Sequence, residues 1–179
     1  MQNEKYADAP SEILDRIYSV LQRMLGLHRQ LYDICKMERE SIVNLDLKAL
    51  ADHTSAKELV IETIRQAEAE RIRESARLSL EWNVPLPSLT LNYIIQEVEP
   101  KDSKRAERFR SALTALTVLI DRAKKQNESN RDLIERSMVH VQEMKKNVLG
   151  EAVPASDTYG NQGQKVGQTG GSRLLSTEA

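Results

Sequence analysis

DSKRAERFRSALTALTVLIDRAKKQNESNRDLIERSMVHVQEMKKNVL, residues 102–149, is the stretch that decides the fold. One set of positions in it recurs at an unbroken alternation of four and three residues. This seam consists of Phe109, Leu113, Leu116, Ile120, Ala123, Asn127, Asn130, Ile134, Ser137, Val141, Met144 and Val148. The spacing places the seam on one face of a helix and is typical of a coiled coil. Gly150 and Pro154 then end the pattern, so the sequence predicts one long helix from Asp102 to Leu149.

Two helices are predicted upstream of this seam. Residues 11–84 contain no proline, the strongest helix breaker. Ser11 is a suitable N-cap for a first helix, which carries an apolar stripe from Leu14 to Ile42. Asn44-Leu45-Asp46 interrupts this helix, and Asp46 can cap a second helix that folds back antiparallel on the first.

The second helix and its exit have their own signals. Four Glu/Arg pairs at i,i+3 spacing predict a solvated, ion-paired helix face: Glu62-Arg65, Glu68-Arg71, Glu70-Arg73 and Glu74-Arg77. The prolines of Val84-Pro85-Leu86-Pro87-Ser88 then end the helix, and Ser88 can cap a short helix over residues 89–98. Trp82 and Tyr93 flank this connector and are expected to pack the end of the hairpin. The predicted fold is all-α, with long antiparallel helices that form a helical hairpin and coiled-coil bundle.

Composition divides the chain into a helical domain over residues 1–150 and a tail over residues 151–179. Five of the seven glycines lie in the tail among Gln, Ser and Thr, and this composition predicts a segment that is disordered when free. The net charge of only −1, with 30% charged residues, argues against a nucleic-acid partner. The start of the sequence lacks the apolar core of a signal peptide, and no stretch is apolar enough for membrane insertion, so a cytoplasmic location is expected.

Enzyme chemistry finds no support in the sequence. The chain has no Glu-x-x-His pair of the di-iron type, no Walker-type glycine loop and no nucleophile elbow, and its one cysteine, Cys35, cannot build a cysteine metal cage. We therefore expect no catalytic residue, no metal site and no cofactor. His28, on the first apolar stripe, is interpreted as structural. The basic residues Lys101, Lys104, Arg105 and Arg108 are interpreted as a solvated face, with an acidic partner as the alternative.

The C-terminal part of the long helix carries the candidate binding surface. We call this surface the apolar strip; it consists of Ile134, Met138, Val141, Met144, Lys145 and Val148. Methionine side chains adapt to more than one partner, which favours a docking surface for a partner helix. The alternative is that the first hairpin covers the strip permanently. Asn127 and Asn130 interrupt the apolar seam and are expected to fix its register.

Several segments together resemble the FlgN family. The first helix contains Lys36-Met37-Glu38-Arg39-Glu40, the second contains Lys57 and Arg71, and the last contains Asn127-Glu128-Ser129-Asn130-Arg131-Asp132-Leu133-Ile134. In the tail, Tyr159-Gly160-Asn161-Gln162-Gly163 resembles the family's Tyr-Gly-x-x-Gly element, and Gly170-Gly171 follows. The tail departs from the family in additional residues around Lys165 to Thr169.

The resemblance implies a cytoplasmic chaperone for the hook-associated proteins FlgK and FlgL, bound through their C-terminal segments by the last helix and tail. It also implies that Tyr159, with Gly160 and Gly163, docks on the cytoplasmic domain of the export gate protein FlhA. The alternative for Tyr159 is that its ring packs back on the last helix. The competing function is a structural coiled-coil adaptor, in which the seam forms a permanent homodimer.

Overall fold

The computed structural model describes residues 9–149, which form four α-helices, one 3-10 turn and no strand. The helices are α1 (Ala9–Val43), α2 (Leu47–Trp82), α3 (Leu91–Val98) and α4 (Ser103–Leu149), and the turn η1 is Leu86–Ser88. The predicted all-α fold with a helical hairpin is confirmed. The chain divides into two compact units, Met1–Arg136 and Ser137–Ala179. We call them the bundle unit and the C-terminal unit and describe each by itself.

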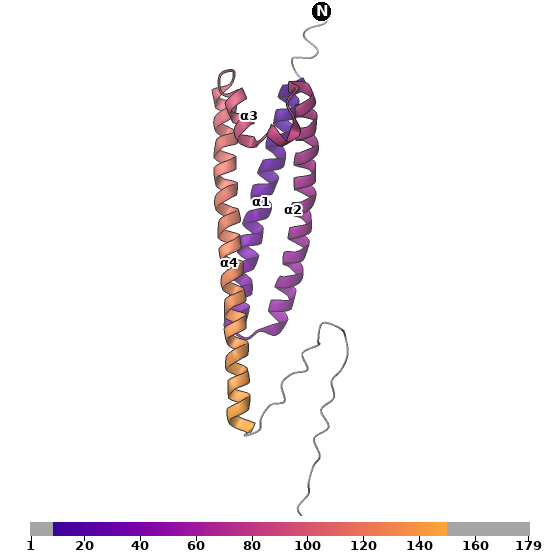
Figure 1. Ribbon diagram of the computed structural model, residues 1–179. Coiled ribbons are helices and arrows are strands. Elements are labelled where there is room, and N and C mark those ends of the chain that lie inside the picture. Colours follow the sequence, from indigo (N-terminus) through magenta and orange to yellow (C-terminus); the bar gives the residue numbers. More distant parts are fainter. Residues whose placement is uncertain (1–8, 150–179) are drawn as a thin grey trace, which may run out of the picture. The chain divides into compact units, whose positions relative to one another are not determined.

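In the bundle unit, α1 and α2 form the predicted antiparallel hairpin (Figure 1). Arg16 near the start of α1 pairs with Glu74 near the end of α2, at 3.1 Å between Nε and Oε2. The turn between the helices contains Leu45 with a φ of 57°, and the Asp46 side chain accepts a 2.9 Å hydrogen bond from the backbone N–H of Ala49. Asp46 is therefore the N-cap that the sequence predicts.

Two predicted caps are different in the structure. Ser11 lies inside α1, which begins at Ala9, and its hydroxyl accepts a hydrogen bond from Arg105. Ser88 lies in η1, and Thr90 instead caps α3 by accepting from the backbone N–H of Tyr93 at 3.1 Å. Both errors arise because a hydroxyl residue after proline is a suitable cap, whereas helix ends depend on the packing of neighbouring elements.

The connector returns the chain to the core. Asn83 ends α2 in the left-handed conformation, with a φ of 52°, which asparagine tolerates better than most residues. The rings of Trp82 and Tyr93 then meet at 6.5 Å between centroids, so the predicted packing at this end of the hairpin is confirmed. The short helix α3 buries Ile94, Ile95 and Val98 in the hydrophobic core.

Within the bundle unit, α4 runs in the same direction as α1. Arg105 of α4 donates to the Ser11 hydroxyl at 2.8 Å, and Asn130 donates to the backbone carbonyl of Cys35 at 2.6 Å. Between these contacts, seam residues pack against α1. The core contributed by α4 consists of Ala106, Phe109, Ala112 and Leu116, with Leu113 partly buried against it. Phe109 also meets the ring of Tyr18 edge-on at 5.5 Å.

Not every predicted pair or seam position behaves as expected. Three of the four Glu/Arg pairs of α2 form, but Glu70 is bound by Arg23 of α1 rather than by Arg73. Of the two seam asparagines, Asn130 is buried and Asn127 is exposed.

The C-terminal unit is described over residues 137–149, which continue the helical hydrogen-bonding of α4. The predicted domain boundary at residue 150 stays a prediction.

Candidate functional site

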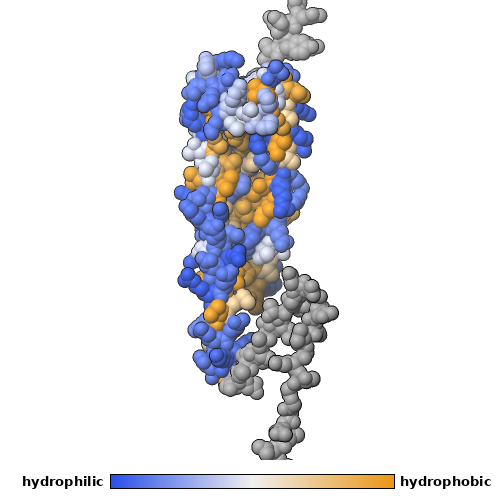
Figure 2. Space-filling model, in the orientation of Figure 1, coloured by the Kyte–Doolittle hydropathy of each residue, from blue (hydrophilic) through white to orange (hydrophobic). Residues whose placement is uncertain are grey.

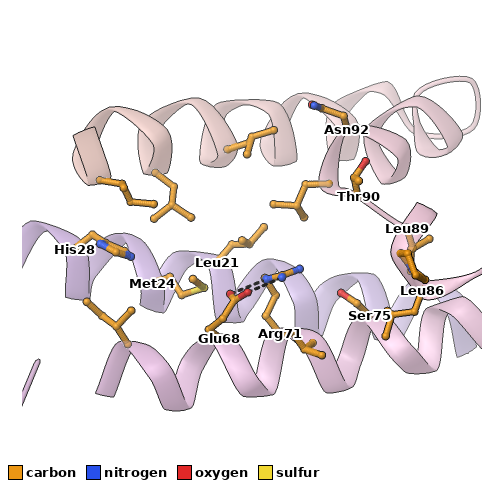
Figure 3. Close-up of a pocket in the computed structure, with 17 residues that line it drawn as sticks. Leu21, Met24, His28, Glu68, Arg71, Ser75, Leu86, Leu89, Thr90 and Asn92 are labelled. Atoms are coloured by element: carbon orange, nitrogen blue, oxygen red, sulfur yellow. Dashed lines mark hydrogen bonds and ion pairs between the residues drawn. The ribbon is translucent and has the colours of Figure 1, made fainter. Parts of the chain in front are cut away.

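A groove of about 900 Å³ opens between α2 and α4 in the bundle unit, with α1 as its floor (Figure 3). Figure 2 shows hydrophobic side chains gathered along the middle of this face, with hydrophilic ones on either side. The lining residues come from five elements. They are Leu21, Met24 and His28 of α1; Ile64, Glu68, Arg71, Ile72 and Ser75 of α2; Leu86, Pro87, Leu89, Thr90, Leu91 and Asn92 of η1, α3 and their flanks; and Leu113, Leu116 and Ile120 of α4.

The charges that line the groove neutralise each other. Arg71 donates to both carboxylate oxygens of Glu68, at 2.8 and 2.6 Å. These hydrogen bonds raise the pKa of Arg71 above its ordinary value. Burial lowers the pKa of His28 below 6.5, and the nearby Glu68 opposes that shift only in part, so the imidazole is neutral at neutral pH.

Two polar atoms of the groove lining have no hydrogen-bond partner within the described residues. They are Nδ1 of His28 and the hydroxyl oxygen of Ser75, and both atoms are buried. Buried polar atoms are nearly always paired in folded proteins. Because neither atom is exposed, neither contributes a hydrogen-bonding group to the surface of the groove.

A polar layer lies toward the turn that joins α1 and α2. We define this layer as Glu38, Lys57, Asn127 and Asn130. Lys57 Nζ lies 2.7 Å from Oε1 of Glu38 and donates to the Asn127 side chain at 3.1 Å. Asn130 accepts from Gln126 at 3.0 Å while it donates to the Cys35 carbonyl. The layer therefore links all three long helices, which supports the predicted register role of the two asparagines.

The apolar strip is exposed. Ile134, Met138, Val141, Met144 and Val148 are between 38% and 79% exposed, and Lys145 is exposed as well. Ile134 belongs to the bundle unit and the others to the C-terminal unit. Their spacing of three and four residues keeps them on one face of α4. Docking of a partner helix on this face, and the alternative of coverage by the hairpin, stay predictions.

The remaining predicted site residues, Tyr159, Gly160 and Gly163, lie outside the described residues. The predicted basic face is partly used inside the bundle unit, because Arg105 pairs with Asp15 and the Arg108 guanidinium stacks 4.2 Å from the centroid of the Tyr18 ring. Among residues 9–149, no group of three His, Cys, Asp or Glu side chains could hold a metal ion. In the same range, no helix combines the length and the apolar composition that a membrane-spanning helix requires.

Sequence reasoning missed the groove. The predicted seam includes Ile120 as a packing position, but Ile120 is 43% exposed and lines the groove, as does Ile72, which is 45% exposed. The available signal was that Ile72 is displaced around α2 from Val60, Ala67 and Leu78, so the apolar residues of this helix extend beyond one face. When the apolar face of a helix is too wide for one neighbouring helix to cover, it indicates a second contact surface.

Comparison with known proteins gives one match. A family model described as FlgN protein matches residues 13–167, which include most of α1, all of the other helices and part of the tail. No curated protein and no solved structure matches the chain.

Proposed function

The chain belongs to the FlgN family of flagellar export chaperones, and on this premise we propose that its clients are the hook-associated proteins FlgK and FlgL. The chain would hold these subunits in the cytoplasm and deliver them to the cytoplasmic domain of FlhA, the gate of the flagellar type III export apparatus. The work consists of binding and release, and it requires no cofactor.

The exposure of the apolar strip is the observation that carries this proposal. A continuous row of half-exposed Val, Met and Ile side chains on one helix is costly in water unless a partner covers it. The row matches the anchors at i, i+4 and i+7 that one amphipathic helix presents to another. Client subunits whose terminal segments form such helices would be kept from premature assembly while the strip covers them.

The tail would then make the second contact. Tyr159 has few apolar neighbours in sequence, so its ring is suited to anchor on another protein, and Gly160 and Gly163 leave the backbone free to turn beside it. Tyr159→Ala should therefore weaken binding to the cytoplasmic domain of FlhA while FlgK binding stays unchanged. Equal FlhA affinity of the two proteins would contradict this role of Tyr159.

A double variant on the strip and a single control variant off the strip test this surface. Val141→Asp with Met144→Asp should weaken FlgK binding at least tenfold in a calorimetric titration, because each change places a charge against the client's apolar face. Val139→Asp is the control, because Val139 is equally exposed but lies off the strip. Equal affinities for control and double variant would refute the proposal.

Light scattering tests the adaptor alternative, since a permanent homodimer stays dimeric on dilution and after mixing with FlgK.

A further inference from the structure

We propose that the groove between α2 and α4 is a second docking site, which takes an amphipathic helix of the exported client. This inference rests on the proposed function, because it assigns a further contact to the same client. The strip would hold one segment of the client, and the groove would hold another. The helix in the groove would complete a four-helix arrangement around the lining residues of α1, α2 and α4.

The spacing of the lining residues favours a helix as the occupant. Along α1 they are Leu21, Met24 and His28; along α2 they run from Ile64 to Ser75; and along α4 they are Leu113, Leu116 and Ile120. The α1 and α4 rows advance by three or four residues, as do Ile64, Glu68, Arg71 and Ser75 of α2, and this is the ridge spacing that a packed helix fills. The α2 row alone is about 16 Å long at about 1.5 Å per residue, or roughly three turns of an added helix. The connector closes one end, since Leu86, Leu89 and Thr90 belong to the lining.

The charge of the lining restricts the chemistry of that helix. Glu68 and Arg71 already satisfy each other, so a charged side chain that enters the groove would find no free counterion in its lining. The complementary face is therefore uncharged and aliphatic. We thus expect an occupant with Leu, Ile, Val or Met as its anchors in the groove.

Site-specific photo-crosslinking identifies the occupant directly. Benzoylphenylalanine replaces Ile72 in the groove, Met144 on the strip, or Leu80 as an exposed control on α2 that does not line the groove. The full-length chain is irradiated with full-length FlgK, and the linked peptides are identified by mass spectrometry. We expect the Ile72 position to capture a FlgK helix that differs from the segment captured at Met144.

The other outcomes overturn the proposal. Capture at Ile72 of residues 150–179 of the same chain would show that its own tail occupies the groove. Capture of an isotopically distinct second copy would show an interface between copies. Capture no stronger than at Leu80 would show an empty groove. In each case, a FlgK crosslink at Met144 shows separately whether the proposed function holds.

Affinity measurements give an independent test. Ile72→Glu with Ile120→Glu should weaken FlgK binding about tenfold, because both carboxylates enter a groove with no free cation. Leu80→Glu with Val118→Glu is the matched control, because these side chains are also exposed on α2 and α4 but do not line the groove. The control should change affinity less than twofold. Both proteins should keep the helix content and thermal midpoint of the unaltered chain, since all four positions are at least 43% exposed. Equal affinities for the two double variants would refute the groove as a client site.

Discussion

Lys57→Met should lower the free energy of unfolding by about 3 kcal/mol, because it leaves the Glu38 carboxylate buried without its cation. The Glu38 side chain is 4% exposed, and Lys57 Nζ lies 2.7 and 2.8 Å from its two oxygens. The hydroxyl of Thr54, at 3.4 Å, is too distant to replace the ammonium group. Breaking a buried pair costs about 3–5 kcal/mol. The lower end applies because the Lys57 side chain is itself 21% exposed, so water already reaches the pair.

Removing the carboxylate of this pair should destabilise the chain less than removing the ammonium group does. Glu38→Leu should lower the free energy of unfolding by about 1–2 kcal/mol. The ammonium group of Lys57 is partly exposed, so water can hydrate it while it keeps its hydrogen bond to Asn127. The double variant with both changes should be more stable than Lys57→Met alone, since it contains no buried unpaired charge.

Urea unfolding followed by far-ultraviolet circular dichroism measures all three variants. Lys124→Met is the control, because Lys124 forms a 4.0 Å surface pair with Glu128 and is 72% exposed, so its loss should cost less than about 0.5 kcal/mol. The reasoning would be wrong if Lys57→Met cost no more than this control, or if adding Glu38→Leu restored no stability.

Three further predictions concern the bundle unit. Asn130→Ala should destabilise by about 1–3 kcal/mol, because it removes two hydrogen bonds at a buried position; an unchanged urea midpoint would contradict this. Leu78→Ala, at a fully buried position, should cost about 2–5 kcal/mol, whereas Leu80→Ala, at an exposed position of the same helix, should stay within about 0.5 kcal/mol in the same assay. His28 should make stability fall as pH decreases from 6.5, because its pKa is lowered in the folded chain and the unfolded chain therefore binds the proton first. His28→Gln should flatten the dependence of the free energy of unfolding on pH below 6.5, and an identical dependence in both proteins would exclude this role.

The helices could be predicted because local signals and tertiary packing agree for them. The break at residues 44–46, the Asp46 cap and the long seam of α4 each have a mechanism within a few residues of sequence. The predicted caps at Ser11 and Ser88 were wrong because a hydroxyl residue after proline is a suitable cap on local grounds, whereas contacts such as that of Arg105 with Ser11 depend on the fold.

The candidate surfaces could be predicted only in part. The strip follows from helical spacing alone, which needs no knowledge of the neighbouring helices. The groove depends on how far α2 and α4 lie apart across α1, and no periodic pattern encodes that separation. The seam spacing predicts the same burial for all of its positions. In the bundle unit Ala123 and Asn130 are buried, whereas Ile120 and Asn127 are exposed.

Cys35 supplies the chain with a native reporter of helix opening. It is the single cysteine of the sequence, it is buried on α1, and its backbone carbonyl is bound by Asn130 of α4. Burial, and then the nearby Glu38, raise the pKa of its thiol, and the thiolate is the form that reacts. A maleimide can therefore modify the unaltered chain only during the moments when the helices separate around Cys35. The labelling rate measures the free energy of that local opening, as amide exchange does for backbone groups, and no engineered probe is required.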